Sequence, residues 1–237
     1  MPNVQFQTSN GQKVANIWNS DHALVDEGSY FIATTPTAGT GVAMVTSVVD
    51  DAATASSTHA QASPLLYIQN NDGIGPNGRT IYLKYIRLTQ IISSQAWTSA
   101  TNAQFSWRRD NVPRLTTAAT VITPVNLNPI SGGGSPASIS FGANVCALPS
   151  AAGAMVGRGQ IQGTIPLPGD QWIFTFGDVA APTNALGASA IKNITIPCGP
   201  LAISPGWNLA LDIWATSLGA APAFELEMGF VSRIAGQ

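Results

Sequence analysis

Short runs in which apolar and polar residues alternate recur along the chain, separated by Gly, Pro and Asn. This period of two is typical of β-strands. The clearest runs are 207–214 and 224–230, and each is predicted to be a strand with one buried face. Further strands are predicted at 64–69, 103–108, 159–165, 171–176 and 191–196.

One predicted strand changes its parity part-way along. Ile81 and Leu83 are apolar at odd positions, whereas Ile86 and Leu88 carry the apolar role at even positions. Because a slip of one residue moves every later side chain to the other face, the pattern predicts a β-bulge near Tyr85.

Helical periodicity is scarce. Only residues 43–62, rich in Ala but also in Thr, Ser and Val, could form a weak helix, and a loop is the other interpretation. Many short strands with varied connections favour an all-β fold, an antiparallel two-sheet jelly-roll sandwich. Residues 1–28 alternate less and are predicted to be an extended N-terminal arm, with 29–237 as one jelly-roll-like domain.

The composition indicates assembly with other proteins. Only 9% of the residues are Asp, Glu, Lys or Arg, against about 25% in an ordinary soluble domain. A surface with so few charges exposes neutral and apolar patches, and such patches are usually covered by partners.

The net charge of −2 is unevenly distributed. Residues 1–78 hold one basic and six acidic residues, and residues 79–114 hold six basic and one acidic. The basic residues are dispersed along strand-like sequence, so nucleic-acid binding is not expected. We expect the acidic and basic parts to meet, within one subunit or between subunits.

Candidate catalytic and metal-binding residues are few. His22 and His59 are the only histidines. The run 20–22 contains Ser, Asp and His, but a catalytic triad is built from distant parts of a fold, so a solvated turn is the preferred interpretation. Residues 50–51 are both Asp, yet their spacing from His59 matches no known metal site.

Three further motifs also lack the features that their chemistry needs. The Gly-rich run 157–163 misses the dinucleotide-binding spacing and precedes no helix. Residues 70–75 resemble a calcium loop only loosely and are better explained by a hairpin turn. Glu225 and Glu227, two residues apart on the polar face of a strand, do not form a glycosidase pair. We therefore expect no catalytic residue, no cofactor and no metal, and an enzyme is the weakest hypothesis.

The two cysteines, Cys146 and Cys198, make neither a metal site nor a disulfide framework. Buried thiols are the preferred interpretation, and a bridge between them is the alternative. The N-terminal sequence lacks the pattern of a secretory signal, and no apolar stretch has the length of a membrane span. We expect synthesis in the cytoplasm without processing.

Several segments are similar to uncharacterised structural proteins of tailed bacteriophages. They are 30–41, 78–88, 123–128, 165–170, 203–209 and 224–230. The similarity begins near Ser29, and it rests on strands and turns. It implies a virion component similar to jelly-roll capsid decoration (cement) proteins, which often sit as trimers on the shell. The implied partners are further copies of the chain, the major capsid protein or other virion proteins, without a membrane.

A second function is compatible with the same resemblance. The turn that leads into residue 207 is also similar to tumour-necrosis-factor-like trimers and to head or tail fibres. A receptor-binding fibre or appendage domain that recognises host glycan is therefore the alternative, with some of the six tryptophans as a stacking platform. Trp107, however, alternates with polar residues as a core residue would.

Five residues are candidates for subunit contacts. In the arm these are Val4, Phe6, Ile17 and Trp18, which we expect to pack on another subunit or on the shell. Trp214 shares its strand parity with the polar or small residues at 208, 210 and 212, opposite the apolar row at 207, 209, 211 and 213. A tryptophan on a solvent face predicts a subunit interface, and local cover by a loop is the alternative.

Overall fold

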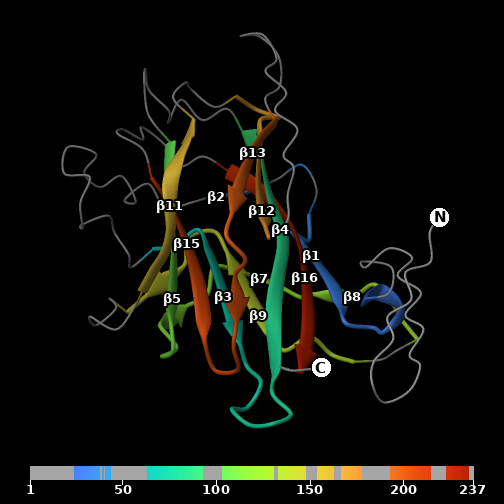
Figure 1. Cartoon of the computed structure of the whole chain (residues 1–237). Coiled ribbons are helices and arrows are strands. Elements are labelled where there is room, and N and C mark those ends of the chain that lie inside the picture. Colours follow the sequence, from blue (N-terminus) through green and yellow to red (C-terminus); the bar gives the residue numbers. More distant parts are fainter. Residues whose placement is uncertain are drawn as a thin grey trace.

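The structure is a computed structural model in which almost all regular structure is β-strand (Figure 1). It describes residues 24–37, 39, 41–43, 63–92, 103–130, 133–147, 154–162, 167–177, 193–214 and 223–234. The predicted all-β class, with several antiparallel sheets, is confirmed. One helical turn at residues 24–26 precedes the first strand.

The larger sheet has eight strands, and its main path runs β13-β12-β4-β16-β1-β8. In that order the strands are Asn193–Cys198, Gln171–Phe176, Arg79–Ile92, Ala223–Ile234, Tyr30–Thr34 and Val125–Asn126. Two short strands join the path at its sides, β14 (Ala202–Ile203) beside β4 and β2 (Val42–Ala43) beside β16. The β12–β13 pair is parallel, and the other pairs of this sheet are antiparallel.

The second sheet has six antiparallel strands in the order β11-β5-β15-β3-β9-β7. These strands are Ala154–Gln162, Ala103–Asp110, Asn208–Trp214, Leu66–Asn70, Ala137–Phe141 and Thr120–Ile122. A separate two-stranded ribbon joins β6 (Leu115–Thr117) to β10 (Val145–Cys146).

The two large sheets pack face to face around one apolar core. Phe174 of β12 lies edge-on to Phe105 and Trp107 of β5, with ring centroids 5.0 and 5.4 Å apart. Trp107 is buried, as its alternation predicts. Truncating such a fully buried aromatic side chain typically costs about 3–5 kcal/mol, so this contact is a main link between the sheets.

Most predicted strands are present. The strand at 171–176 has the predicted bounds, and those predicted at 64–69, 103–108, 191–196 and 224–230 are displaced or extended by a few residues. The strand expected at 159–165 begins earlier, at Ala154, and is described as far as Gln162. Nearly all of the possible helix at 43–62 lies outside the described residues.

The predicted β-bulge is confirmed. Tyr85 lies opposite Gly229 and Leu83 lies opposite Phe230, so Lys84 is the extra residue of β4. Ile81, Leu83, Ile86 and Leu88 are consequently all buried, whereas Tyr85 is only half-buried.

The expectation of a single buried face is wrong for β15. The apolar row at 209, 211 and 213 is buried as predicted, but Asn208, Ala210 and Asp212 are buried as well. The second face of this strand is therefore not a solvent face.

Side chains from neighbouring strands and from the ribbon cover that second face. Ala210 packs in a small apolar cluster with Tyr67 of β3 and Cys146 of the ribbon. Asp212 accepts a hydrogen bond from Arg108 of β5, with Nε and Oδ2 2.8 Å apart, in a buried ion pair. Alternation within one strand cannot reveal a cover that comes from elsewhere in the sequence.

Candidate interaction face

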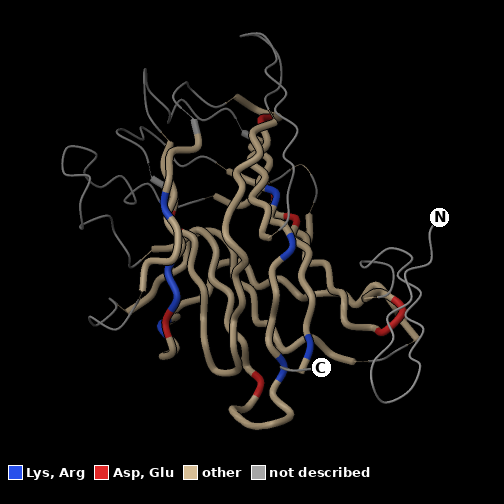
Figure 2. Tube along the Cα trace, viewed as in Figure 1, with Lys and Arg blue, Asp and Glu red and all other residues tan. Residues whose placement is uncertain are grey.

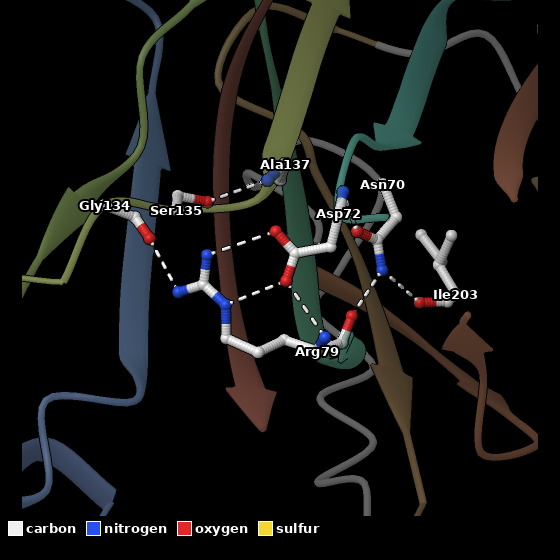
Figure 3. Close-up of polar contacts among 7 residues, drawn as sticks. All are labelled: Asn70, Asp72, Arg79, Gly134, Ser135, Ala137 and Ile203. Carbon is white, nitrogen blue, oxygen red and sulfur yellow. Dashed lines mark hydrogen bonds and ion pairs between the residues drawn. The ribbon is translucent and has the colours of Figure 1, made fainter. Parts of the chain in front are cut away.

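The loop that loosely resembles a calcium site is held by an arginine (Figure 3). The expectation of a hairpin turn is wrong, because β3 and β4 on either side of the loop belong to different sheets. Asp72 accepts hydrogen bonds from the backbone N–H and from Nε of Arg79, both at 2.9 Å. The same guanidinium donates to the carbonyl oxygen of Gly134 at 2.8 Å. The hydrogen bond from the Arg79 side chain lowers the pKa of Asp72. A carboxylate paired in this way is a structural lock between β4 and the loop before β9.

Asn70 extends this lock to a third segment. Its Nδ2 donates to the carbonyl oxygen of Arg79 at 2.7 Å and to that of Ile203 at 2.8 Å (Figure 3). Because Asn70 is buried, these bonds satisfy a side-chain amide that would otherwise be costly to bury. The cluster fixes one end of the sandwich.

The glycines of the run 157–163 that the structure describes serve packing. Gly157 and Gly159 lie in β11, where a Cβ would approach the rings of Trp107 and Phe105 to 3.2 and 2.9 Å. These positions therefore accept little more than glycine.

Glu225 and Glu227 have partners within the chain. Glu227 accepts a hydrogen bond from the Tyr85 hydroxyl at 2.9 Å and pairs with Arg87. Glu225 accepts a hydrogen bond from the backbone N–H of Gly39. Burial, together with the hydrogen bond to Glu227, raises the pKa of Tyr85 above its ordinary value.

The basic residues of the stretch 79–114 pair mostly with acidic residues of the C-terminal strands or of the same stretch. Arg87 pairs with Glu227 and Arg108 with Asp212, and Arg114 pairs with Asp110 at 2.7 Å. Among the described ion pairs, only Arg79–Asp72 joins the basic stretch to the acidic residues 1–78. Complementary pairing is thus present within one chain.

Both cysteines are free thiols, so the bridge is absent, and the interpretation as a buried thiol is confirmed for Cys146. Cys146 is buried and Cys198 is half-buried. Burial raises the pKa of each thiol to about 11. At neutral pH neither is a thiolate, the form that acts as nucleophile or metal ligand.

Several predicted residues cannot be placed. His22, His59 and the arm residues Val4, Phe6, Ile17 and Trp18 lie outside the described residues. The backbone of Trp214 ends β15 opposite Gln104, but its side chain is outside the description. In the part of the chain that is described, no cluster of His, Cys, Asp or Glu could hold a metal ion. No described helix has the length and apolar character to cross a membrane.

One surface stands out, on the face of the eight-stranded sheet that points away from the core. A row of apolar and aromatic side chains crosses this face, and cross-strand pairs place its members side by side. We call it the outer belt: Tyr82 of β4, Val231 of β16, Tyr30 and Ile32 of β1, Val125 of β8, and Leu127 just beyond it. Alternation did not single it out, because the belt gathers one or two residues from each of four strands.

The middle of the outer belt is covered and its two ends are exposed. Leu24, from the helical turn, packs on Tyr30 and Val231, and all three are buried. At one end Tyr82 is 39% exposed, and at the other Val125 is 64% exposed. Residues 24–28 were expected in the arm, but Leu24 packs on the domain.

A groove lies at the Tyr82 end of the outer belt. It has a volume of about 280 Å³, and its walls are Leu24, Tyr82 and Val231 with Ile234. Lys84, the extra residue of the bulge, and Arg233 also line it. An apolar floor with cationic side chains suits an aromatic group.

The chain has no match among protein-family models, curated proteins or solved structures.

Proposed function

We propose that this chain is a structural protein of a virus particle of the tailed-phage type, a capsid decoration subunit that acts through protein contacts and not as an enzyme. The observation that carries the proposal is a sparsely charged chain with a partly exposed apolar belt. Only 9% of the residues are charged, and charges are few along the described strands (Figure 2). The phage-like segments add support.

The mechanism of such a subunit is burial of surface. A standard protein interface removes about 1,600 Å² from water, and each Å² of apolar area contributes about 25 cal/mol. The exposed ends of the outer belt are the described surface best suited to this role. We further propose that the two large sheets form a jelly roll and that the subunit assembles as a trimer.

The arm residues and Trp214 belong to the same proposal. Val4, Phe6, Ile17 and Trp18 are proposed to pack on another subunit or on the shell. Trp214 remains a proposed anchor at a subunit contact, although the other residues of its row are buried inside the chain.

The deciding experiment is to locate the protein in the particle. Mass spectrometry of purified virions and a low-resolution map should find the chain in many copies on the shell. Its absence from purified particles would overturn the proposal.

The alternative is a fibre or appendage domain that binds host glycan. The exposed Tyr82, beside a groove with Lys84 and Arg233, is the observation in its favour, because aromatic faces pack against apolar ligand surfaces. A glycan array separates the two functions, since a decoration protein should show no selective binding. A Tyr82→Ala variant is the matched control for any signal.

A further inference from the structure

The groove at the Tyr82 end of the outer belt has the size and the chemistry for one aromatic side chain. An engineered apolar cavity of about 150 Å³ binds benzene, so a groove of about 280 Å³ has room for an indole. Leu24, Tyr82 and Val231 supply apolar walls. Lys84 and Arg233, the latter paired with Glu27, also line the groove, and cationic side chains are attracted to the face of an indole ring.

The polypeptide enters the described structure at this groove. Leu24 is the first described residue, and it lines the groove. Twenty-three residues precede it, and Trp18 lies six residues before it. Six extended residues span about 20 Å, whereas the four strands under the outer belt span about 14 Å. The length of the chain therefore keeps Trp18 within reach of a surface of this size.

The partly exposed outer belt offers a surface to another molecule, and the proposed function requires contacts between subunits. In the single chain Tyr82 and Val125 retain 39% and 64% exposure, and Leu127 retains 41%. A buried tryptophan is a common energetic anchor of interfaces. An N-terminal segment exchanged between copies would cover the groove and join subunits at once.

We propose that Trp18 in the N-terminal segment, residues 1–23, of a second copy of this chain docks in this groove. The inference rests on the proposed function, which requires contacts between subunits. It adds the surface and the side chain that make one of those contacts.

Mixed cross-linking of full-length protein tests the proposal. One preparation carries Asn19→Cys, and a second, with a size tag, carries Ile234→Cys at the groove. Both preparations also carry Cys198→Ser, because Cys198 is half-buried, whereas Cys146 is buried. After mixing and mild oxidation, a disulfide-linked dimer of one tagged and one untagged chain is expected. The matched control places the cysteine at Ile74, which is 89% exposed in the β3–β4 loop and does not line the groove, and should give no such dimer.

Two further variants separate docking from folding. Trp18→Ala and Tyr82→Asp should each weaken self-association by about tenfold or more, measured by light scattering over a dilution series, with unchanged thermal unfolding of the diluted protein. Ile74→Asp should associate like the parent chain. Equal cross-linking at Ile74 and Ile234 would overturn the inference. So would a chain carrying both Asn19→Cys and Ile234→Cys that forms the disulfide only within itself.

Failure of this inference is distinguishable from failure of the proposed function. If the protein is found on particles but the mixed dimer does not form, the docking site is wrong and the structural role stands. If the mixed dimer forms but purified particles lack the protein, the docking site stands and the virion role is wrong.

Discussion

At the scale of single residues, Gly229 shows how closely the outer face of the large sheet is packed. A Cβ at this position would lie 2.5 Å from Cε1 of Tyr85 and 2.8 Å from the Tyr30 hydroxyl. Two aromatic rings thus occupy the space above a glycine in the middle of β16. Gly229 does not have a positive φ, so its backbone conformation does not call for a glycine. The neighbouring tyrosines do, because they leave no room for a Cβ.

Gly229→Ala should therefore destabilise the protein by about 1–3 kcal/mol, since the added methyl group forces a tyrosine to move. Urea unfolding measures the change. Gly199→Ala is the matched control, because a Cβ there meets no atom within 4 Å. Equal stability of the two variants would show that Tyr85 moves aside without cost.

The buried ion pair between Arg108 and Asp212 gives a second residue-scale prediction. The Asp212 side chain is fully buried and that of Arg108 is 10% exposed. Asp212→Ala leaves a buried guanidinium without this carboxylate and should cost about 3–5 kcal/mol of unfolding free energy. Glu27→Ala, which breaks an exposed pair with Arg233, should cost about 1 kcal/mol or less. Similar losses in chemical denaturation would contradict the distinction.

At the scale of elements, the strands follow from alternation and the cover of their outer faces does not. The pattern around Tyr85 predicted the bulge, because the core imposes one parity before it and the other after it. For β15, in contrast, alternation predicted one buried face, whereas both faces are buried. Its second face is buried by the β6–β10 ribbon and by Arg108, and these contacts cross more than 60 residues of sequence.

The candidate interaction face was still harder to predict. The sequence placed residues 1–28 in an arm, whereas Leu24 packs on Tyr30 and Val231. The outer belt combines four strands that are separated along the chain, so its continuity depends on sheet order. Sequence supplied the residue types, and strand pairing made them neighbours.

The ion pair of Asp72 with Arg79, in the loop between β3 and β4, predicts a pH dependence of stability. Hydrogen bonding to Arg79 lowers the folded-state pKa of Asp72 below its ordinary value. The stabilisation is therefore present above the unfolded-state pKa of about 3.9 and is lost as the pH falls through the lower folded-state pKa. Asp72→Asn should be less stable than the parent chain at pH 6 and nearly equal to it near pH 2. A stability difference that does not depend on pH would contradict this account.

At the scale of the whole molecule, the distribution of charge determines which force can drive assembly. The separate acidic and basic segments predicted complementary contact, within one subunit or between subunits. The described pairs of Arg79, Arg87, Arg108 and Arg114 lie within one chain. Among the surfaces that the structure describes, the partly exposed outer belt is the one best suited to a partner.

Self-association should therefore be insensitive to salt or slightly strengthened by it. Raising NaCl from about 0.1 M to about 1 M shortens the screening length from about 10 Å to about 3 Å, which weakens exposed ion pairs but not apolar burial. Sedimentation of the full chain at a series of concentrations gives the association constant at each salt level. Val125→Asp is the matched variant, because it places a charge at the 64% exposed end of the outer belt. It should weaken association at low salt and recover part of the loss at high salt if a like charge lies nearby across the interface. An association constant that falls at least about tenfold for the parent chain would show that ion pairs between subunits dominate, and the outer belt would then be a minor contact.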